Sequence, residues 1–111
     1  MTPEDLVEIE AIKRLKYRYA RLLDTKDFEG LSELFVKDAT ASYSGGQLSY
    51  DGRDAIIGFL RTVLGPTTML TSHLVGQPEI ELTGPDSADG RWALQDLVII
   101  TEQFVAREPD A

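Results

Sequence analysis

Hydrophobic residues recur at three- and four-residue steps through the first part of the chain. The apolar positions with this spacing are Ile9, Ile12, Leu15, Tyr19 and Leu22. Charged residues fill the gaps between them, and this pattern predicts an amphipathic helix over residues 4–24. Thr2 and Pro3, followed by two acids, favour a helix start because proline fits the first turn and carboxylates complement the helix dipole.

Two shorter helices are predicted between residues 27 and 65. Asp27 can cap a helix that continues through Phe35. The buried edge of that helix consists of Phe28, Leu31, Leu34 and Phe35. A third helix opens within residues 51–54 and stops at Gly65–Pro66, because this pair favours helix termination. Its inward positions are Ile56, Ile57, Leu60, Val63 and Leu64.

The pattern changes to alternation at Thr40, which is typical of a strand. Ala39, Ala41 and Tyr43 share one face of it. Gly45–Gly46 can supply the positive φ angles of a tight turn, so residues 48–50 are predicted to return as a second short strand.

Two long strands are predicted in the last third of the chain. The first covers residues 69–82 and is interrupted near Pro78, which removes a hydrogen-bond donor and favours a bulge. Residues 83–89 have the composition of a turn, and residues 90–101 form the second strand. This order predicts an α+β fold in which three helices pack on one face of a single, strongly curved antiparallel sheet.

Composition is that of a soluble globular protein. With 111 residues the chain forms one domain over 1–111, because two separate cores would each be too small. Its hydrophobic fraction of 42% and charged fraction of 27% are ordinary. No apolar run approaches the roughly 20 residues that span a bilayer, and the acidic start lacks the basic residues of a signal peptide. We therefore expect a cytoplasmic protein that does not bind membranes.

The net charge of −8 argues against nucleic-acid binding, which needs clustered cations. The basic residues of the first helix interleave with its apolar positions and predict a solvated helix face. These residues are Lys13, Arg14, Lys16, Arg18 and Arg21. The absence of cysteine from the sequence excludes a disulfide framework and a thiolate metal site.

Two ionisable residues interrupt the apolar pattern of the long strands. Burying a lone carboxylate is costly, so Asp96 must be paired, protonated or in a wet cavity. Its neighbours on the same face are Trp92, Leu94, Val98 and Ile100. His73, the only histidine, would lie opposite or diagonal to Asp96 if the hairpin turns near Gly84–Pro85. Such a pair can form a general base or a purely structural ion pair.

Two tyrosines and a second aspartate complete the candidate site. Tyr19 faces inward from the first helix, and the small neighbours of Tyr43 leave room for a phenol in a cavity. Asp24 ends the first helix, where a carboxylate opposes the dipole, and this favours a specific role. The alternative is that the tyrosines pack in the core and the aspartate belongs to a turn.

Four segments of the chain, taken in order, resemble SnoaL-like proteins of the nuclear-transport-factor-2-like superfamily. These segments are Ile9–Asp24, Thr40–Leu48, Ser72–Ile80 and Gly90–Asp96. Their motifs are most similar to those of the bile-acid 7-alpha-dehydratases of that family. The resemblance implies a cone-shaped fold with a pocket at its wide end, and chemistry without a metal or cofactor.

The resemblance also implies which residues act. The catalytic positions would be Tyr19, Asp24, Tyr43, His73 and Asp96. Side-chain alternation along the last strand, rather than the resemblance, assigns the apolar, substrate-binding walls to Trp92, Leu94 and Val98, which share the face of Asp96. His73, oriented by Asp96, would take a proton next to a carbonyl group, the tyrosines would donate hydrogen bonds, and Asp24 would position one of these groups.

The activity implied in this way is β-elimination of water from a hydrophobic, ring-type hydroxy-carbonyl compound such as a steroid or polyketide. An isomerase of the ketosteroid-isomerase kind is one alternative, because double-bond migration begins with the same proton abstraction. The other alternative is a non-catalytic module that binds a small molecule or assembles with other subunits.

The resemblance is incomplete at the end of the chain. SnoaL-like proteins continue with two further strands, where an arginine belongs to the dehydratase site, and the sequence through Ala111 contains neither. Either the sequence is a truncated form, or another subunit completes the sheet. The last strand would otherwise offer an unpaired edge, so we expect a homo-oligomer, either a dimer or a trimer.

Overall fold

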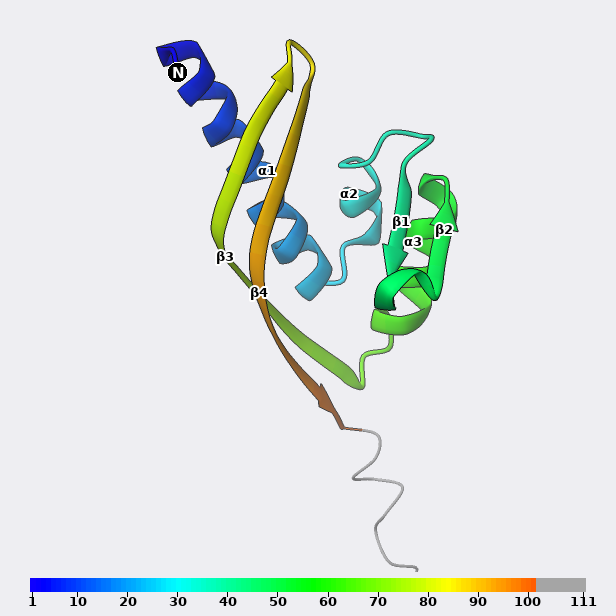
Figure 1. The fold of residues 1–111 in the computed structure, drawn as a ribbon. Coiled ribbons are helices and arrows are strands. Elements are labelled where there is room, and N and C mark those ends of the chain that lie inside the picture. The colour runs from blue at the N-terminus through cyan, green and yellow to red at the C-terminus, as the bar shows by residue number, and fades with distance from the viewer. Residues whose placement is uncertain (102–111) are drawn as a thin grey trace, which may run out of the picture.

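The computed structural model describes residues 1–101. Its elements in chain order are α1 (Pro3–Asp24), α2 (Phe28–Ser32), β1 (Thr40–Tyr43), a 3-10 turn (Ser44–Gly46), β2 (Leu48–Asp51), α3 (Arg53–Leu64), β3 (Met69–Gly84) and β4 (Ser87–Ile100). Three helices and antiparallel strands confirm the predicted α+β class (Figure 1).

Helix α1 begins where the sequence predicted, and its start is doubly capped. The Thr2 hydroxyl accepts a hydrogen bond of 3.1 Å from the Asp5 N–H, and the Asp5 carboxylate accepts one of 2.9 Å from the Thr2 N–H. This reciprocal pair satisfies donors that have no partner within the helix.

Helix α2 is shorter than predicted. Asp27 caps it through the Gly30 N–H, as expected, but the helix ends at Ser32 instead of continuing through Phe35. Beyond Ser32 the backbone forms tight turns, in which the Phe35 N–H donates to the carbonyl of Ser32, three residues earlier. Phe35 nevertheless packs against the core, because an apolar contact does not require α-helical geometry.

The strands form two separate two-stranded antiparallel sheets within residues 1–101, rather than the single sheet that was predicted. β1 pairs with β2 across a turn in which Gly45 and Gly46 have the predicted positive φ angles of 66° and 93°. β3 and β4 form a long, curved hairpin with the predicted bulge, between Gly76 and Glu79. No backbone ladder joins the two pairs, so the sheet is not closed into a barrel.

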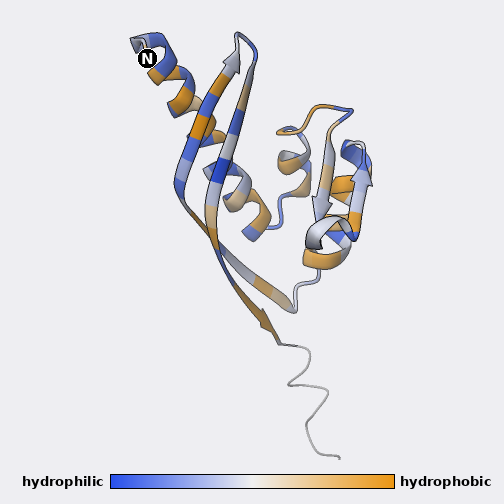
Figure 2. Cartoon of the chain, viewed as in Figure 1, coloured by the Kyte–Doolittle hydropathy of each residue, from blue (hydrophilic) through white to orange (hydrophobic). Residues whose placement is uncertain are grey.

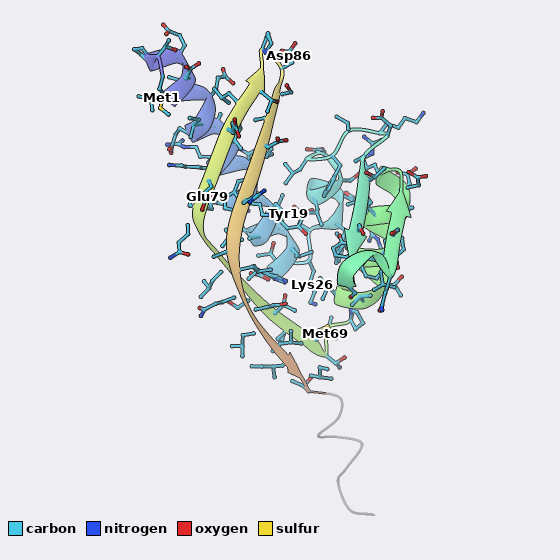
Figure 3. The ribbon with its side chains drawn as sticks, viewed as in Figure 1. Met1, Tyr19, Lys26, Met69, Glu79 and Asp86 are labelled. Carbon is cyan, nitrogen blue, oxygen red and sulfur yellow. The ribbon has the colours of Figure 1, made fainter. Side chains whose placement is uncertain are left out.

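The hairpin turn is also tighter than predicted. β3 extends to Gly84 and β4 starts at Ser87, so only residues 85 and 86 connect them, whereas residues 83–89 were predicted as a turn. Asp86 lies at the tip (Figure 3). Polar residues such as Asp89 continue the ladder here, since pairing uses backbone groups and both faces of the tip are exposed.

The hydrophobic core forms where the second half of α1 meets α2 and α3. Its buried residues are Leu22, Leu23, Phe28, Leu31, Ile56, Ile57 and Leu60. The first half of α1 extends beyond α2 and α3 (Figure 1). Leu15 is 42% exposed although it lies on the apolar stripe, whereas Leu22 and Leu23 near the end of the helix are buried. The core therefore supports the end of α1 most firmly.

Lys26 holds three elements together just after α1. Its backbone has a φ of 60°, and its amino group donates to the Leu64 carbonyl at the end of α3 and, at 2.6 Å, to the Met69 carbonyl at the start of β3. Figure 3 shows Lys26 and Met69 in the same region. These bonds place the first residues of β3 beside the last turn of α1.

The hairpin is apolar near the end of β4 (Figure 2). On its outer face, opposite the face that carries His73 and Asp96, the apolar side chains are Leu70, Leu74, Leu97 and Ile99. All four side chains are substantially exposed, and Leu74 reaches 62%. None of the helices described in residues 1–101 has both the length and the apolar character needed to cross a membrane.

Candidate active site

Asp24 and His73 make the tightest side-chain contact between the helical layer and the hairpin. Nδ1 of His73 lies 2.6 Å from Oδ1 of Asp24, and the backbone N–H of His73 donates to Oδ2 at 2.8 Å. The Thr71 hydroxyl donates to Oδ1 at 2.9 Å. Asp24 thus binds both the ring and the backbone of His73, and holds the histidine in one orientation.

These bonds also keep Asp24 ionised. Burial acts to raise the pKa of Asp24, but the bonds from the His73 backbone, the His73 ring and the Thr71 hydroxyl together lower it below its ordinary value of 3.8. Residues of β3 therefore stabilise the ionised Asp24. Their hydrogen bonds offset the unfavourable interaction of this carboxylate with the negative, C-terminal end of the α1 dipole.

Asp96 contacts the other nitrogen of the same ring. His73 and Asp96 are direct cross-strand partners, and Nε2 of His73 lies 3.3 Å from Oδ1 of Asp96. The His73 side chain is only 10% exposed, whereas that of Asp96 is 43% exposed. His73 therefore lies between two carboxylates, with Asp24 on its protein side and Asp96 on the side open to solvent.

The ring can change its role with its protonation. When Nδ1–H donates to Asp24, a neutral ring presents the lone pair of Nε2, which can accept a proton. Once protonated, Nε2–H can donate to Asp96, so both carboxylates stabilise the imidazolium. This arrangement has the elements of a general base that later acts as an acid.

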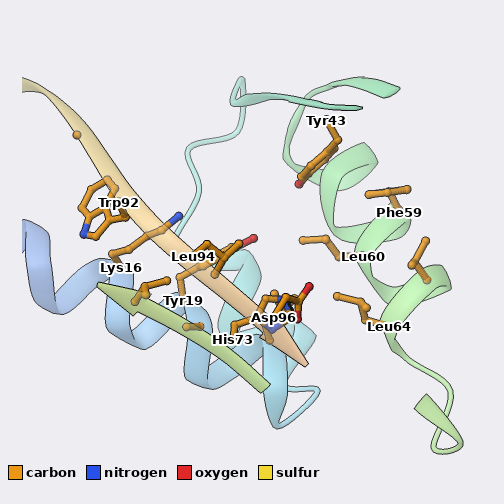
Figure 4. Close-up of a pocket in the computed structure, with 15 residues that line it drawn as sticks. Lys16, Tyr19, Tyr43, Phe59, Leu60, Leu64, His73, Trp92, Leu94 and Asp96 are labelled. Carbon is orange, nitrogen blue, oxygen red and sulfur yellow. Dashed lines mark ion pairs between the residues drawn. The ribbon is translucent and has the colours of Figure 1, made fainter. Parts of the chain in front are cut away.

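A pocket of about 570 Å³ adjoins Nε2 (Figure 4). The predicted site residues in its lining are Tyr19, Tyr43, His73, Trp92, Leu94 and Asp96. Helix α3 contributes the apolar side chains of Phe59, Leu60, Val63 and Leu64. Apolar walls with a few converging polar groups are typical of a small-molecule site.

Both tyrosines of the pocket favour their protonated forms. Burial, helped by the charge of Tyr43, raises the pKa of Tyr19 to about 12. Burial, helped by the charge of Tyr50, also raises the pKa of Tyr43. Each hydroxyl therefore carries a proton at neutral pH and can donate a hydrogen bond to a negatively charged oxygen.

Two of the predicted placements differ from the arrangement in the structure. Val98 is not among the residues that line the pocket: it pairs with Thr71, two residues beyond Asp96, and it is 46% exposed. Asp96 was expected to orient His73, but the shorter contact and the backbone hydrogen bond belong to Asp24.

Lys16 and Phe59 are among the pocket residues that were not predicted. Lys16, assigned to the solvated face of the first helix, lies in the lining with its amino group 4.7 Å from the Tyr19 ring centroid. It is four residues after Ile12 and three before Tyr19, so helical spacing already placed it on the apolar stripe. Phe59 was also missed, and its ring stacks on Tyr50 with a centroid distance of 4.3 Å.

Among the residues that the structure describes, no group of three or more His, Asp or Glu side chains is arranged to hold a metal ion.

Comparison with known proteins gives one family match. A model of the SnoaL-like domain matches residues 4–109. Among solved structures, the chain is similar to a protein from Novosphingobium aromaticivorans DSM 12444 that is provisionally named a scytalone dehydratase. The two are 32% identical, with a TM-score of 0.83, and the match covers 91% of this chain and 66% of that chain.

Two more distant structures share the fold. ActVI-ORFA from Streptomyces coelicolor is 15% identical, with a TM-score of 0.69, over 82% of this chain and 69% of that chain. The beta subunit of the benzoate 1,2-dioxygenase from Burkholderia mallei ATCC 23344 is 22% identical, with a TM-score of 0.64, over 80% of this chain and 66% of that chain. The present chain thus spans about two thirds of the length of these proteins.

Proposed function

The chain belongs to the SnoaL-like domain family, and we propose that it is a dehydratase that eliminates water from a hydrophobic, ring-type hydroxy-carbonyl compound. One observation carries the proposal: His73 is held by Asp24 and Asp96 beside a pocket that also contains two protonated tyrosines. The name of the Novosphingobium protein, which is 32% identical, supports the same reaction class.

The proposed reaction begins with proton transfer. Nε2 of His73 takes the proton from the carbon next to the carbonyl group, and the electrons of that C–H bond form an enolate. Asp24 and Asp96 stabilise the resulting imidazolium through its two N–H groups. Tyr19 and Tyr43 donate hydrogen bonds to the enolate oxygen, where negative charge develops.

The second step expels the hydroxyl group. The enolate re-forms the carbonyl, its electrons form the new carbon–carbon double bond, and the C–O bond of the β-hydroxyl breaks. The imidazolium of His73 gives its proton to the departing oxygen, so water leaves and the neutral ring is restored. The reaction is redox-neutral, so proton donors and acceptors are sufficient for it.

Two other functions compete with this one. An isomerase would use the same first step and return the proton to a different carbon, so it needs no further residue. A non-catalytic small-molecule-binding or assembly module is favoured by the similarity of fold to the dioxygenase beta subunit. A hydrophobic ligand in the pocket is common to all three.

The test uses ring β-hydroxy ketones and follows the absorbance of the conjugated enone that forms. We expect turnover by the full chain and a loss of about 100-fold or more in His73→Gln, the size typical of a missing acid–base group. Tyr17→Phe is the control, because Tyr17 is exposed and lies outside the pocket.

The alternatives give different results in the same experiment. Conversion of a β,γ-unsaturated ketone without any dehydration would indicate an isomerase. Tight binding of the hydroxy ketones with no turnover would support the binding module. Undiminished dehydration by His73→Gln would contradict the proposed role of His73.

A further inference from the structure

Lys16 is the one lysine that lines the pocket. It projects from α1 so that its amino group lies 4.7 Å from the ring centroid of Tyr19 and 5.3 Å from that of Trp92. Cations are attracted to the faces of aromatic rings, so the two side chains hold the amino group at this place. Figure 4 shows Lys16 beside Trp92, at the end of the pocket away from His73 and Asp96.

Among residues 1–101 the charge of Lys16 is not matched by a carboxylate. Within residues 1–101 no Asp or Glu oxygen lies within 4.0 Å of its amino group, whereas Arg14, two residues earlier on α1, pairs with Glu10 at 3.3 Å. Burial lowers the pKa of Lys16. Its positive charge is therefore partly desolvated, and a bound anion would offset that cost.

Lys16 lies beside the proposed donor Tyr19 but is distant from Asp24 and Asp96, the carboxylates that contact His73, along both elements. Trp92 and Asp96 are four residues apart on β4, a separation of about 13 Å along a strand. Lys16 and Asp24 are eight residues apart on α1, about 12 Å along a helix. These separations place His73 and its two carboxylates toward one end of the pocket and the cation toward the other (Figure 4).

The space continues past Lys16. An adjoining hollow of about 350 Å³ shares Lys16, Tyr19, Tyr43 and Trp92 with the pocket. The remaining walls of that hollow are Ile12, Leu15, Leu34 and Phe35. A ligand that reaches from His73 toward this hollow passes the amino group of Lys16.

We propose that Lys16 binds a carboxylate of the ligand, and that the site selects flat ring compounds that carry one negative charge at the end far from His73. A single ammonium group matches the single charge of a carboxylate, whereas phosphate sites gather several donors. The aromatic faces of Tyr19 and Trp92 flank the same position and suit a planar ring. The chain as a whole has a charge of −8, so this selectivity comes from the local position of Lys16.

This inference deepens the proposed function, but its test requires only binding. Calorimetric titration compares 2-naphthoate with 2-naphthamide, which has nearly the same shape and no charge. For the unmodified chain we expect naphthoate to bind about tenfold more tightly, the size of one charge-assisted hydrogen bond. We expect Lys16→Met to lose this preference while retaining its affinity for naphthamide, which also shows that the variant is folded.

Two further variants serve as controls. Lys16→Arg keeps the charge and should keep the preference for naphthoate. Lys13→Met removes the same charge from a position on α1 outside the pocket, so it should also keep the preference. Equal affinities of the unmodified chain for both probes, no binding of naphthoate at millimolar concentration, or a preference that survives in Lys16→Met would each overturn the proposal.

The two proposals can fail separately. If naphthoate selectivity depends on Lys16 but no hydroxy ketone is dehydrated, the carboxylate site stands and the dehydratase assignment is lost. If dehydration depends on His73 but naphthoate is not preferred, the reverse holds. His73→Gln should leave the naphthoate preference intact, since His73 lies at the other end of the pocket.

Discussion

Nδ1 of His73 lies 2.6 Å from Oδ1 of Asp24, although the two residues are 49 positions apart in the chain. The contact joins the last residue of α1 to the fifth residue of β3, and the His73 backbone N–H strengthens it with a second bond of 2.8 Å. Because Asp24 binds from the protein side, Nε2 is directed to the pocket and its Asp96 neighbour. The helix end therefore determines which nitrogen of His73 is available for chemistry.

Asp24 should make the stability of the fold depend on pH in the acid range. Its folded pKa is lower than the unfolded value, so its contribution is fully present above the unfolded value of about 4 and is lost as the pH falls through the folded pKa. Urea unfolding between pH 2 and pH 7 should show this acid loss in the unmodified chain and a weaker dependence in Asp24→Asn.

The matched control is Asp54→Asn, because the side chain of Asp54 is 99% exposed. It should follow the pH dependence of the unmodified chain. Parallel curves for Asp24→Asn and the unmodified chain would show that the contacts from β3 do not stabilise the ionised form of Asp24.

Tyr19 should titrate at a higher pH than an exposed tyrosine. Burial and the charge of Tyr43 raise its pKa to about 12, so the folded chain holds this proton between pH 10 and 12. The associated stability is present below the unfolded pKa and is lost as the pH rises through the folded value. Near-ultraviolet absorbance of tyrosinate should show the late step, and Tyr19→Phe should remove it while Tyr17→Phe leaves it in place.

Lys26 should contribute to stability through two carbonyl groups. Lys26→Met keeps the length of the side chain but leaves the carbonyls of Leu64 and Met69 without this donor. We expect the free energy of unfolding to fall by about 1–3 kcal/mol, the cost typical of an unsatisfied buried acceptor. Lys37→Met, at an exposed position, is the control for charge. Equal urea midpoints for the two variants would contradict this role of Lys26.

The outer face of the hairpin should mediate self-association. Exposed apolar side chains on one face of β3 and β4 favour burial against another copy. Light scattering at micromolar concentration should report a mass greater than that of one chain. Leu97→Glu should shift it toward the monomer, whereas Leu48→Glu, on β2, should not. A monomeric unmodified chain would contradict the predicted dimer or trimer.

Local patterns determined the elements of this fold because each depends on residues close in sequence. The capping box of Thr2 and Asp5, the cap of Asp27 and the turn at Gly45–Gly46 all connect groups within a few positions. Because side chains alternate along β4, Asp96 lies on the same face as Trp92. The turn near residue 85 then places Asp96 opposite His73. These steps needed only backbone geometry and the alternation of side chains.

Contacts between distant elements were decided by the tertiary structure alone. Asp24 could have been a turn residue, and its bonds to Thr71 and His73 arise because Lys26 and the core hold the start of β3 against the end of α1. Lys16 faces the pocket because the hairpin brings Trp92 over it. Val98 shares the face of Asp96 but is not among the residues that line the pocket. The spacing of residues in the sequence determines which side chains lie on the same face of a helix or strand. The packing of the elements determines which other residues that face contacts.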